Sequence, residues 1–302
     1  MNDRQSTDHI LLIEPKVFFT NPETAATNPY QNMEAAVAPA ELLVRVREEI
    51  HGFAEALRHY GIKVTLMPGS KKCPDHIFPG NWVSTHPEKT LVYYPMMAKN
   101  RRAERTKEIC AFLENHYTKI YDYAPLAEKG TFLEGTGSFA LDRAHRVAYM
   151  GISQRSHVAA AEQWAKELDY ELVTFRTALP PDNMPVYHTD LLMFIGYDIA
   201  AVCFEAIPDE KEREAVRVRL SDTHDLVDLS LEQMHNMCGN ALELRGDGGI
   251  AHLVMSTRAY QALTKAQKQK LLRRYVEIIH TPLDTIEEFG GGSARCLILE
   301  LF

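Results

Sequence analysis

A predicted helix followed at once by a predicted strand recurs along this chain roughly every 50 to 60 residues. In the first copy, apolar residues recur at three- and four-residue spacing over 41–60, Gly61 ends the helix, and a strand follows over 62–67. The further copies are helix 101–117 with strand 119–123, helix 156–168 (capped by Ser156) with strand 171–175, helix 208–220 with strand 224–229, and helix 260–276 with strand 278–281. Other strand-like segments, at 91–94, 147–150, 191–195 and 252–255, lie before helices. The pattern predicts a repeating α/β fold.

Five such units can close as a ring of small modules around a central channel, or they can form a doubly wound sheet. A ring brings one strand end per module to one end of the channel, whereas a doubly wound sheet binds its ligand after glycine-rich turns. The chain has no GxGxxG or Walker sequence, and its chemically distinctive residues fall about once per unit near strand ends. We therefore expect the ring, formed as a single domain over residues 1–302.

The charge and composition limit the class of partner. The formal net charge of −8 leaves no global basic surface for nucleic acid, so a small-molecule substrate is expected. The five cysteines are odd in number and lack CxxC spacing, which argues against disulfides or a zinc knuckle and fits a reducing compartment. The polar N-terminal segment is no secretion signal, and no apolar run approaches the roughly 18 residues of a membrane span. A cytoplasmic protein without a membrane partner is expected.

Cys296 follows the flexible run Gly290-Gly291-Gly292 and precedes an apolar stretch, where a loop meets a strand. Consecutive glycines let the main chain approach a ligand closely, and the adjacent Arg295 could favour the reactive thiolate. A buried structural cysteine after a loop is the alternative interpretation.

Two further segments carry groups that could work with a thiolate. Glu134 lies between an apolar start and a turn of small residues, and a structural glutamate that caps the turn is the alternative. His188 and Asp190 alternate by two, so on a strand they share one face. This pair lacks a third ligand nearby and does not predict a metal site. A polar pair on an exposed face is the other interpretation.

Two turns carry candidate binding residues. Asn81 lies beside a tryptophan in a proline-glycine turn, where its amide could instead satisfy the turn backbone. Arg155 comes immediately before a predicted helix, where its guanidinium and the free helix amides could both hold a carboxylate. A solvated arginine is the alternative.

Taken in order, these residues resemble the pattern of the guanidino-group-modifying superfamily, which includes arginine deiminases, dimethylarginine hydrolases and amidinotransferases. The resemblance covers nearly the whole chain and rests on the combination of Asn21-Pro22-Glu23-Thr24, the 78–82 turn, Phe-Leu-Glu-Gly, His-x-Asp, Cys238-Gly239-Asn240 and the terminal triple-glycine cysteine. It implies the pentein fold, a five-bladed α/β propeller. Within the superfamily the chain looks most like the citrulline ureidase branch.

The resemblance also implies roles for the residues. Cys296 would attack the planar carbon of the substrate, His188 would act as acid and then base, and Glu134 and Asp190 would orient the substrate nitrogens. Arg155 would hold the substrate carboxylate, and Asn21 or Asn81 would make polar contacts. No metal or organic cofactor is implied, and a homo-oligomer is possible.

One departure bears on the substrate. Asn81 stands where guanidine-processing relatives have an aspartate that pairs with the positive guanidinium, and an amide suits a neutral urea group better. The expected reaction is therefore hydrolysis of citrulline to ornithine, ammonia and carbon dioxide. Arginine deiminase, dimethylarginine hydrolase and amidinotransferase activities remain alternatives, as does a non-catalytic binding protein of the same fold.

Overall fold

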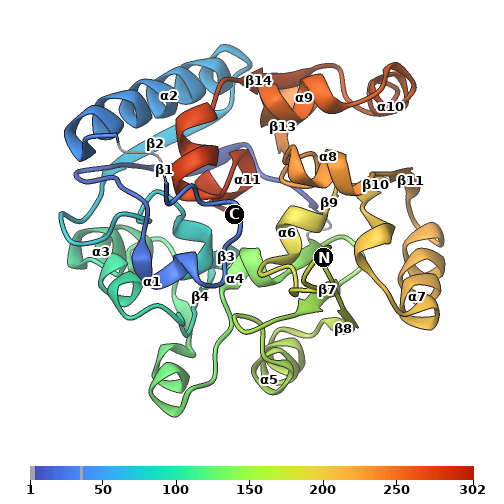
Figure 1. The fold of residues 1–302 in the computed structure, drawn as a ribbon, viewed down its shortest axis with the longest axis horizontal. Coiled ribbons are helices and arrows are strands. Elements are labelled where there is room, and N and C mark those ends of the chain that lie inside the picture. Colours follow the sequence, from blue (N-terminus) through green and yellow to red (C-terminus); the bar gives the residue numbers. More distant parts are fainter. Residues whose placement is uncertain (1–3, 35–36) are drawn as a thin grey trace.

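The computed structural model describes residues 4–34 and 37–302, and within these ranges five three-stranded sheets surround a central axis (Figure 1). In each sheet the middle strand pairs antiparallel with one neighbour and parallel with the other. A parallel pair needs a crossover connection, and helical segments supply it in every module. The predicted ring of five modules is confirmed.

The strands, grouped by sheet, are β15 (Leu299–Glu300), β1 (His9–Glu14) and β2 (Lys63–Pro68); β3 (Val83–His86), β4 (Thr90–Tyr93) and β5 (Lys119–Asp122); β6 (Ala140–Asp142), β7 (Val147–Ile152) and β8 (Glu171–Arg176); β9 (Met193–Ile195), β10 (Ile199–Val202) and β11 (Asp225–Asp228); β12 (Leu242–Arg245), β13 (Ala251–Ser256) and β14 (Ile278–Thr281).

The α-helices are α1 (Pro22–Ala25), α2 (Pro39–His59), α3 (Lys107–Glu114), α4 (Gly135–Ser138), α5 (Val158–Leu168), α6 (Thr189–Leu192), α7 (Glu210–Ser221), α8 (Leu231–His235), α9 (Thr257–Ala262), α10 (Lys265–Leu271) and α11 (Ala294–Leu297). Short 3₁₀ turns include η1 (Pro79–Asn81) and η2 (Asn100–Glu104). In the part of the chain that the structure describes, no helix combines the length and apolar character needed to cross a membrane.

Two of the predicted helices are interrupted. Residues 101–117 form η2 and then α3, because Thr106 accepts a hydrogen bond from the Ile109 amide and starts a new helix. Residues 260–276 divide into α9 and α10, where Thr264 forms a capping box with Gln267. The spacing of apolar residues does not reveal such caps inside a predicted helix.

The expectation that His188 and Asp190 share one face of a strand is wrong, and the strand predicted at 191–195 is shorter. His188 precedes the single-turn helix α6, and only 193–195 are a strand. The turn is held by Thr189, which donates to the Ser138 carbonyl at 2.5 Å, and by Asn240, which donates to the Asp190 carbonyl at 3.1 Å. The predicted cap of the third helix is also wrong, since α5 begins after His157 and Ser156 donates instead to Ser138.

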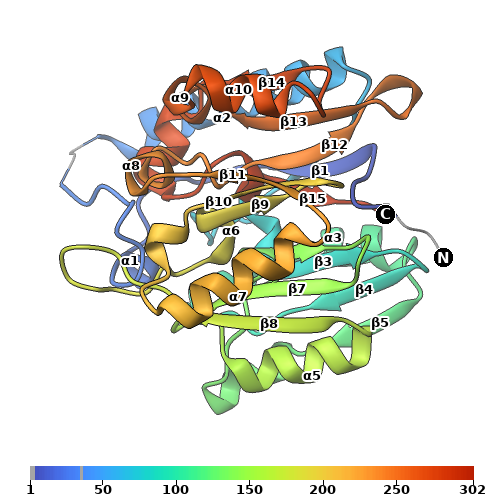
Figure 2. The same cartoon turned by 90° about the vertical axis from the view of Figure 1, so that its right-hand side faces the viewer.

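The first module is closed by the two ends of the described chain. β15 pairs with β1 through Ile10↔Glu300 and Leu11↔Leu299, while β1 also pairs with β2. Figure 2 shows α1 and α8 at one end of the ring and both termini at the other. Short helical turns precede β3, β6, β9 and β15. This repeated turn determines where the polar side chains lie.

Candidate active site

The turn before the first strand of each module carries one distinctive polar residue. In module order these are Cys296 in α11, Asn81 at the end of η1, Glu134 before α4, His188 before α6 and Asn240 before β12. All five are buried, and a cavity near the axis is lined by Asn81, His188 and Cys296 together with Asp75, Arg101 and Arg155. The ring thus gathers residues as far apart in the sequence as Asn81 and Cys296, which are 215 positions apart.

The Cys296 sulfur is held by polar groups from two neighbouring modules. Its thiol donates to Asp190 Oδ2 at 3.3 Å, and Asn240 Nδ2 donates to the sulfur at 3.1 Å. Asn240 Oδ1 also accepts from the Cys296 amide at 3.3 Å. Asn240 therefore holds both the side chain and the backbone of the cysteine. The family pattern includes Cys238-Gly239-Asn240, but the sequence motif by itself does not indicate that Asn240 binds the cysteine.

The environment of Cys296 favours the protonated thiol. Burial, and after it the Asp190 carboxylate, raise the pKa of the thiol well above its usual range. The expected help from Arg295 is absent among the contacts of the described chain, because that guanidinium donates to the Ile298 carbonyl and to Glu300. Sequence adjacency therefore gave the wrong partner, and activation of the thiol requires a proton acceptor.

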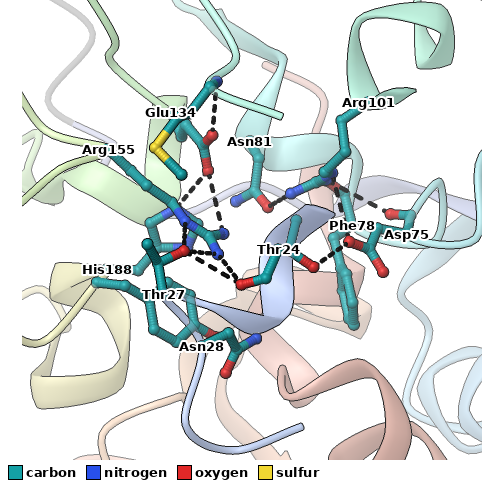
Figure 3. Close-up of polar contacts among 12 residues, drawn as sticks. Thr24, Thr27, Asn28, Asp75, Phe78, Asn81, Arg101, Glu134, Arg155 and His188 are labelled. Carbon is teal, nitrogen blue, oxygen red and sulfur yellow. Dashed lines mark hydrogen bonds and ion pairs between the residues drawn. The ribbon is translucent and has the colours of Figure 1, made fainter. Parts of the chain in front are cut away.

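A second group centres on Glu134 (Figure 3). Its Oε2 accepts from His188 Nε2 at 2.8 Å and lies 3.5 Å from an Arg155 nitrogen, while Oε1 accepts from the Met97 amide at 3.0 Å. Burial alone would raise the pKa of Glu134, but Arg155 and His188 outweigh it and lower the pKa to about 2. Glu134 thus remains a carboxylate that fixes the orientation of the imidazole.

Arg155 is buried rather than solvated. Its guanidinium donates to the Thr24 carbonyl and the Thr27 hydroxyl at 3.0 Å or less and lies 4.6 Å above the Tyr187 ring. It borders the cavity, as a substrate-binding residue would.

Asn81 has a fixed amide orientation. Its Oδ1 accepts from Arg101 at 2.9 Å, and a guanidinium can only donate, so the NH₂ group must point elsewhere. A Cβ built on Gly137 would lie 2.7 Å from Asn81 Nδ2 and 2.6 Å from His188 Nδ1. The glycine therefore leaves these two nitrogens room to approach the same point.

Arg101 itself is held by buried carboxylates. It donates to both oxygens of Glu104, at 2.7 and 3.0 Å. It also lies 3.9 Å from Asp75 Oδ2, as Figure 3 shows. Asn21 donates to the same Asp75 oxygen at 2.8 Å and does not border the cavity, so it supports the site from outside. Sequence motifs did not indicate roles for these two residues, since Asp75 lies in an irregular segment and Arg101 lies at the start of a predicted helix, in the 3₁₀ turn η2.

Acidic side chains outnumber guanidinium groups around the cavity. The carboxylates of Asp75, Glu104, Glu134 and Asp190 face two guanidinium groups. Burial raises the pKa of Asp75 and of Asp190, and raises that of Glu104 to about 7. Asp75 Oδ1 and Asp190 Oδ1 have no hydrogen-bond partner within residues 4–34 and 37–302. Two buried oxygens are thus open to donors.

The fold and this arrangement define the pentein class of guanidino-group-modifying proteins, as the sequence pattern predicts. Residues 14–302 match the family described as N,N dimethylarginine dimethylhydrolase, eukaryotic. The chain belongs to this family.

Similar proteins include two branches of the class. The bifunctional arginine dihydrolase/ornithine cyclodeaminase AgrE of Nostoc sp. (strain PCC 7120) is 23% identical over 257 residues, which are 85% of this chain and 33% of AgrE. The chain therefore spans about a third of that relative. The N-terminal domain of ArgZ, a cyanobacterial arginine dihydrolase, solved with product, has a TM-score of 0.76 at 22% identity over 97% of both chains. A dimethylarginine dimethylaminohydrolase variant, solved as an adduct with S-methyl-L-thiocitrulline, has a TM-score of 0.64 at 15% identity, covering 97% of this chain and 99% of that one.

Proposed function

We propose that this chain is a cysteine-dependent hydrolase that acts on the ureido carbon of free citrulline and on the guanidino carbon of arginine, with ornithine as the final amino-acid product. The observation that carries this proposal is a single cavity lined by Cys296, by His188, whose imidazole is held by Glu134, and by Asn81, whose oxygen is already bound to Arg101. The family and the named activities of the relatives support the reaction class.

In the first half of the proposed reaction, the Cys296 proton passes to Asp190 and the sulfur electron pair forms a bond to the substrate carbon. Asp190 suits this step because it already accepts the thiol hydrogen bond and because burial raises its pKa. His188, in its imidazolium form, protonates the departing ornithine δ-amine as the carbon–nitrogen bond breaks. A carbamoyl group remains on sulfur.

In the second half, His188 takes a proton from water while the hydroxide attacks the carbamoyl carbon. The carbon–sulfur bond breaks, and sulfur recovers its proton from Asp190. The released carbamate decomposes to ammonia and carbon dioxide. Since Glu134 accepts from Nε2 of His188, Nδ1 is the nitrogen available for these transfers.

Two features support acceptance of both substrates. The Asn81 NH₂ group can donate to the ureido oxygen, which a guanidinium lacks. The larger number of acidic side chains and the unpartnered oxygens of Asp75 and Asp190 suit the N–H donors and positive charge of arginine. Hydrolysis of arginine would release ammonia and leave citrulline, which then enters the reaction above. Arg155 stays the proposed partner of the substrate carboxylate, and one catalytic domain and a homo-oligomer remain predictions.

The test is a substrate panel with purified protein, in which citrulline, arginine and N,N-dimethylarginine are supplied separately. We expect ornithine and ammonia from citrulline, and transient citrulline before ornithine from arginine. Cys296→Ala is the control for contaminating activity. Citrulline as the end product from arginine would contradict the ureidase step, and dimethylamine from dimethylarginine without ornithine from either amino acid would favour the family's named reaction. No product from any of the three would refute the proposal.

A further inference from the structure

Asp142, His145 and His224 form a compact cluster outside the active site. Asp142 and His145 belong to the turn between β6 and β7, and His224 joins α7 to β11. One ligand atom from each lies within 4.8 Å of the other two, and within residues 4–34 and 37–302 this is the one group of three such side chains with that property.

The cluster lies at the opposite end of the ring from Cys296. β6 and β9 both start at turns of the active site. Asp142 is the last residue of β6 and Gly196 directly follows β9, so both lie at the far end of the ring. Gln5 donates to Leu141 and Ile195 carbonyls there, which agrees with the position of the termini in Figure 2. A ligand of this cluster would therefore not touch the substrate.

The distances suit a small metal ion. His145 Nδ1 lies 3.0 Å from Asp142 Oδ2, and His224 Nε2 lies 3.9 Å from the same oxygen. Tetrahedral ligands at zinc bond lengths are separated by about 3.3 Å, between these two values. The Gly196 carbonyl oxygen lies 3.1 Å from His224 Nε2, which now donates to it. The ligand atoms of Asp142, His145 and His224 lie within 4.8 Å of one another, so small side-chain adjustments would place these three around one centre.

The charge balance of the cluster leaves a place for a cation. The Asp142 side chain is fully buried, and no lysine or arginine nitrogen of the described residues lies within 4 Å of it. Its ion-pair partners are two histidines, of which His145 is 39% exposed and opens the cluster to solvent. A buried carboxylate normally needs a counter-charge, and a divalent ion would supply it.

The imidazoles can rearrange without net change in protonation. His224 Nε2 now donates to Gly196, and Nδ1 lies 2.8 Å from the Thr223 hydroxyl. If the proton moves to Nδ1, Nδ1 donates to the Thr223 hydroxyl and Nε2 is free to bind the metal. Thr223 is then the hydrogen-bond partner that orients the ligating imidazole. His145 can likewise carry its proton on the exposed Nε2 and offer Nδ1.

We propose that Asp142, His145 and His224 bind one divalent transition-metal ion that joins the third and fourth modules. Two imidazoles and one carboxylate favour an ion of the zinc type over calcium or magnesium, which prefer oxygen ligands. The exposed side of His145 leaves room for a bound water. The ion would act as a cross-link between the β6–β7 turn and the segment after α7.

The experiment titrates Zn²⁺ into metal-free protein by calorimetry and repeats the titration with Co²⁺ to record its absorption spectrum. Because Cys296 is itself a possible zinc ligand, both are performed in the Cys296→Ala background. We expect one equivalent of Zn²⁺ to bind and raise the Tm, and a Co²⁺ spectrum without thiolate charge transfer. His145→Ala should weaken binding at least about 100-fold, more than the loss of an outer partner. His59→Ala, at an exposed histidine of α2, should leave it unchanged.

Equal zinc affinity in His145→Ala and its background would overturn the proposal, as would the absence of saturable binding in the background protein. A Co²⁺ spectrum dominated by thiolate bands would also overturn it. If His145→Ala unfolds, His224→Gln is measured instead, since it keeps a polar group of similar length. A turn held by hydrogen bonds alone predicts that both variants lose stability equally with and without zinc, which is the opposite of the expected metal-dependent loss.

Discussion

Replacement of Asn240 by alanine tests whether the hydrogen bond to Cys296 activates the nucleophile. The Asn240 amide donates to the sulfur at 3.1 Å and its oxygen accepts from the cysteine backbone at 3.3 Å. A hydrogen bond to a charged group contributes about 1.5–3 kcal/mol, and about 1.4 kcal/mol corresponds to a factor of ten. Asn240→Ala should therefore lower kcat/KM about 10- to 150-fold.

The loss of this hydrogen bond should also change the pH dependence of the reaction. Asn240 stabilises the thiolate, so its removal should raise the pKa of Cys296 still further above its usual range. The deficit should then be largest at low pH and shrink as the pH rises. Rates of Cys296 alkylation by iodoacetamide, measured against pH, report the thiolate without substrate.

The control for Asn240→Ala is Asn236→Ala, which removes the same side chain from the end of α8, where it donates to a helix carbonyl. We expect wild-type kinetics from the control. Asn240→Asp should be more impaired than Asn240→Ala because it replaces a donor by a negative charge beside the sulfur. If folded Asn240→Ala retains the wild-type pH profile and alkylation rate, the hydrogen bond has no part in activation.

Three further changes test the remaining roles. Cys296→Ala should remain folded and lose orders of magnitude in turnover, and near-wild-type turnover would refute covalent catalysis. His188→Ala should slow turnover, flatten its pH dependence and let the S-linked intermediate accumulate, as seen by intact-protein mass spectrometry; full activity with an unchanged profile would contradict the assignment. Asn81→Asp should raise arginine turnover relative to citrulline turnover by about tenfold or more. The reason is that a carboxylate, which stabilises a bound guanidinium by a few kcal/mol, replaces a neutral amide. An unchanged ratio of kcat/KM values in the folded variant would remove Asn81 from substrate selection.

The ring was predictable from the sequence because its helices and strands are long enough to show their periods. The single-turn helices were not: α6 has four residues, too few for a 3.6-residue repeat, so His188 and Asp190 resembled neighbours on a strand. The sequence motif correctly placed both residues near Cys296. The expected strand geometry, which was the local argument for their shared direction, was wrong.

The contacts that site residues make across the ring were harder to predict than the identity of the site residues. Arg295 is adjacent to Cys296 but pairs with Glu300, while Asn240, 56 positions away, holds the sulfur. Asp75, in an irregular segment, and Arg101, in η2, likewise form a buried pair. Local sequence carries no information on which modules face each other, so charge pairing between modules requires the closed ring.

The pairing of β15 with β1 makes the catalytic centre a property of the whole ring rather than of any one module. Cys296 lies directly before β15, and its sulfur contacts groups from the fourth and fifth modules. A module that opens locally would remove its own reactive group and also the hydrogen bonds that hold the groups of its neighbours. Local unfolding of any one of the five modules should therefore abolish turnover before the rest of the ring unfolds.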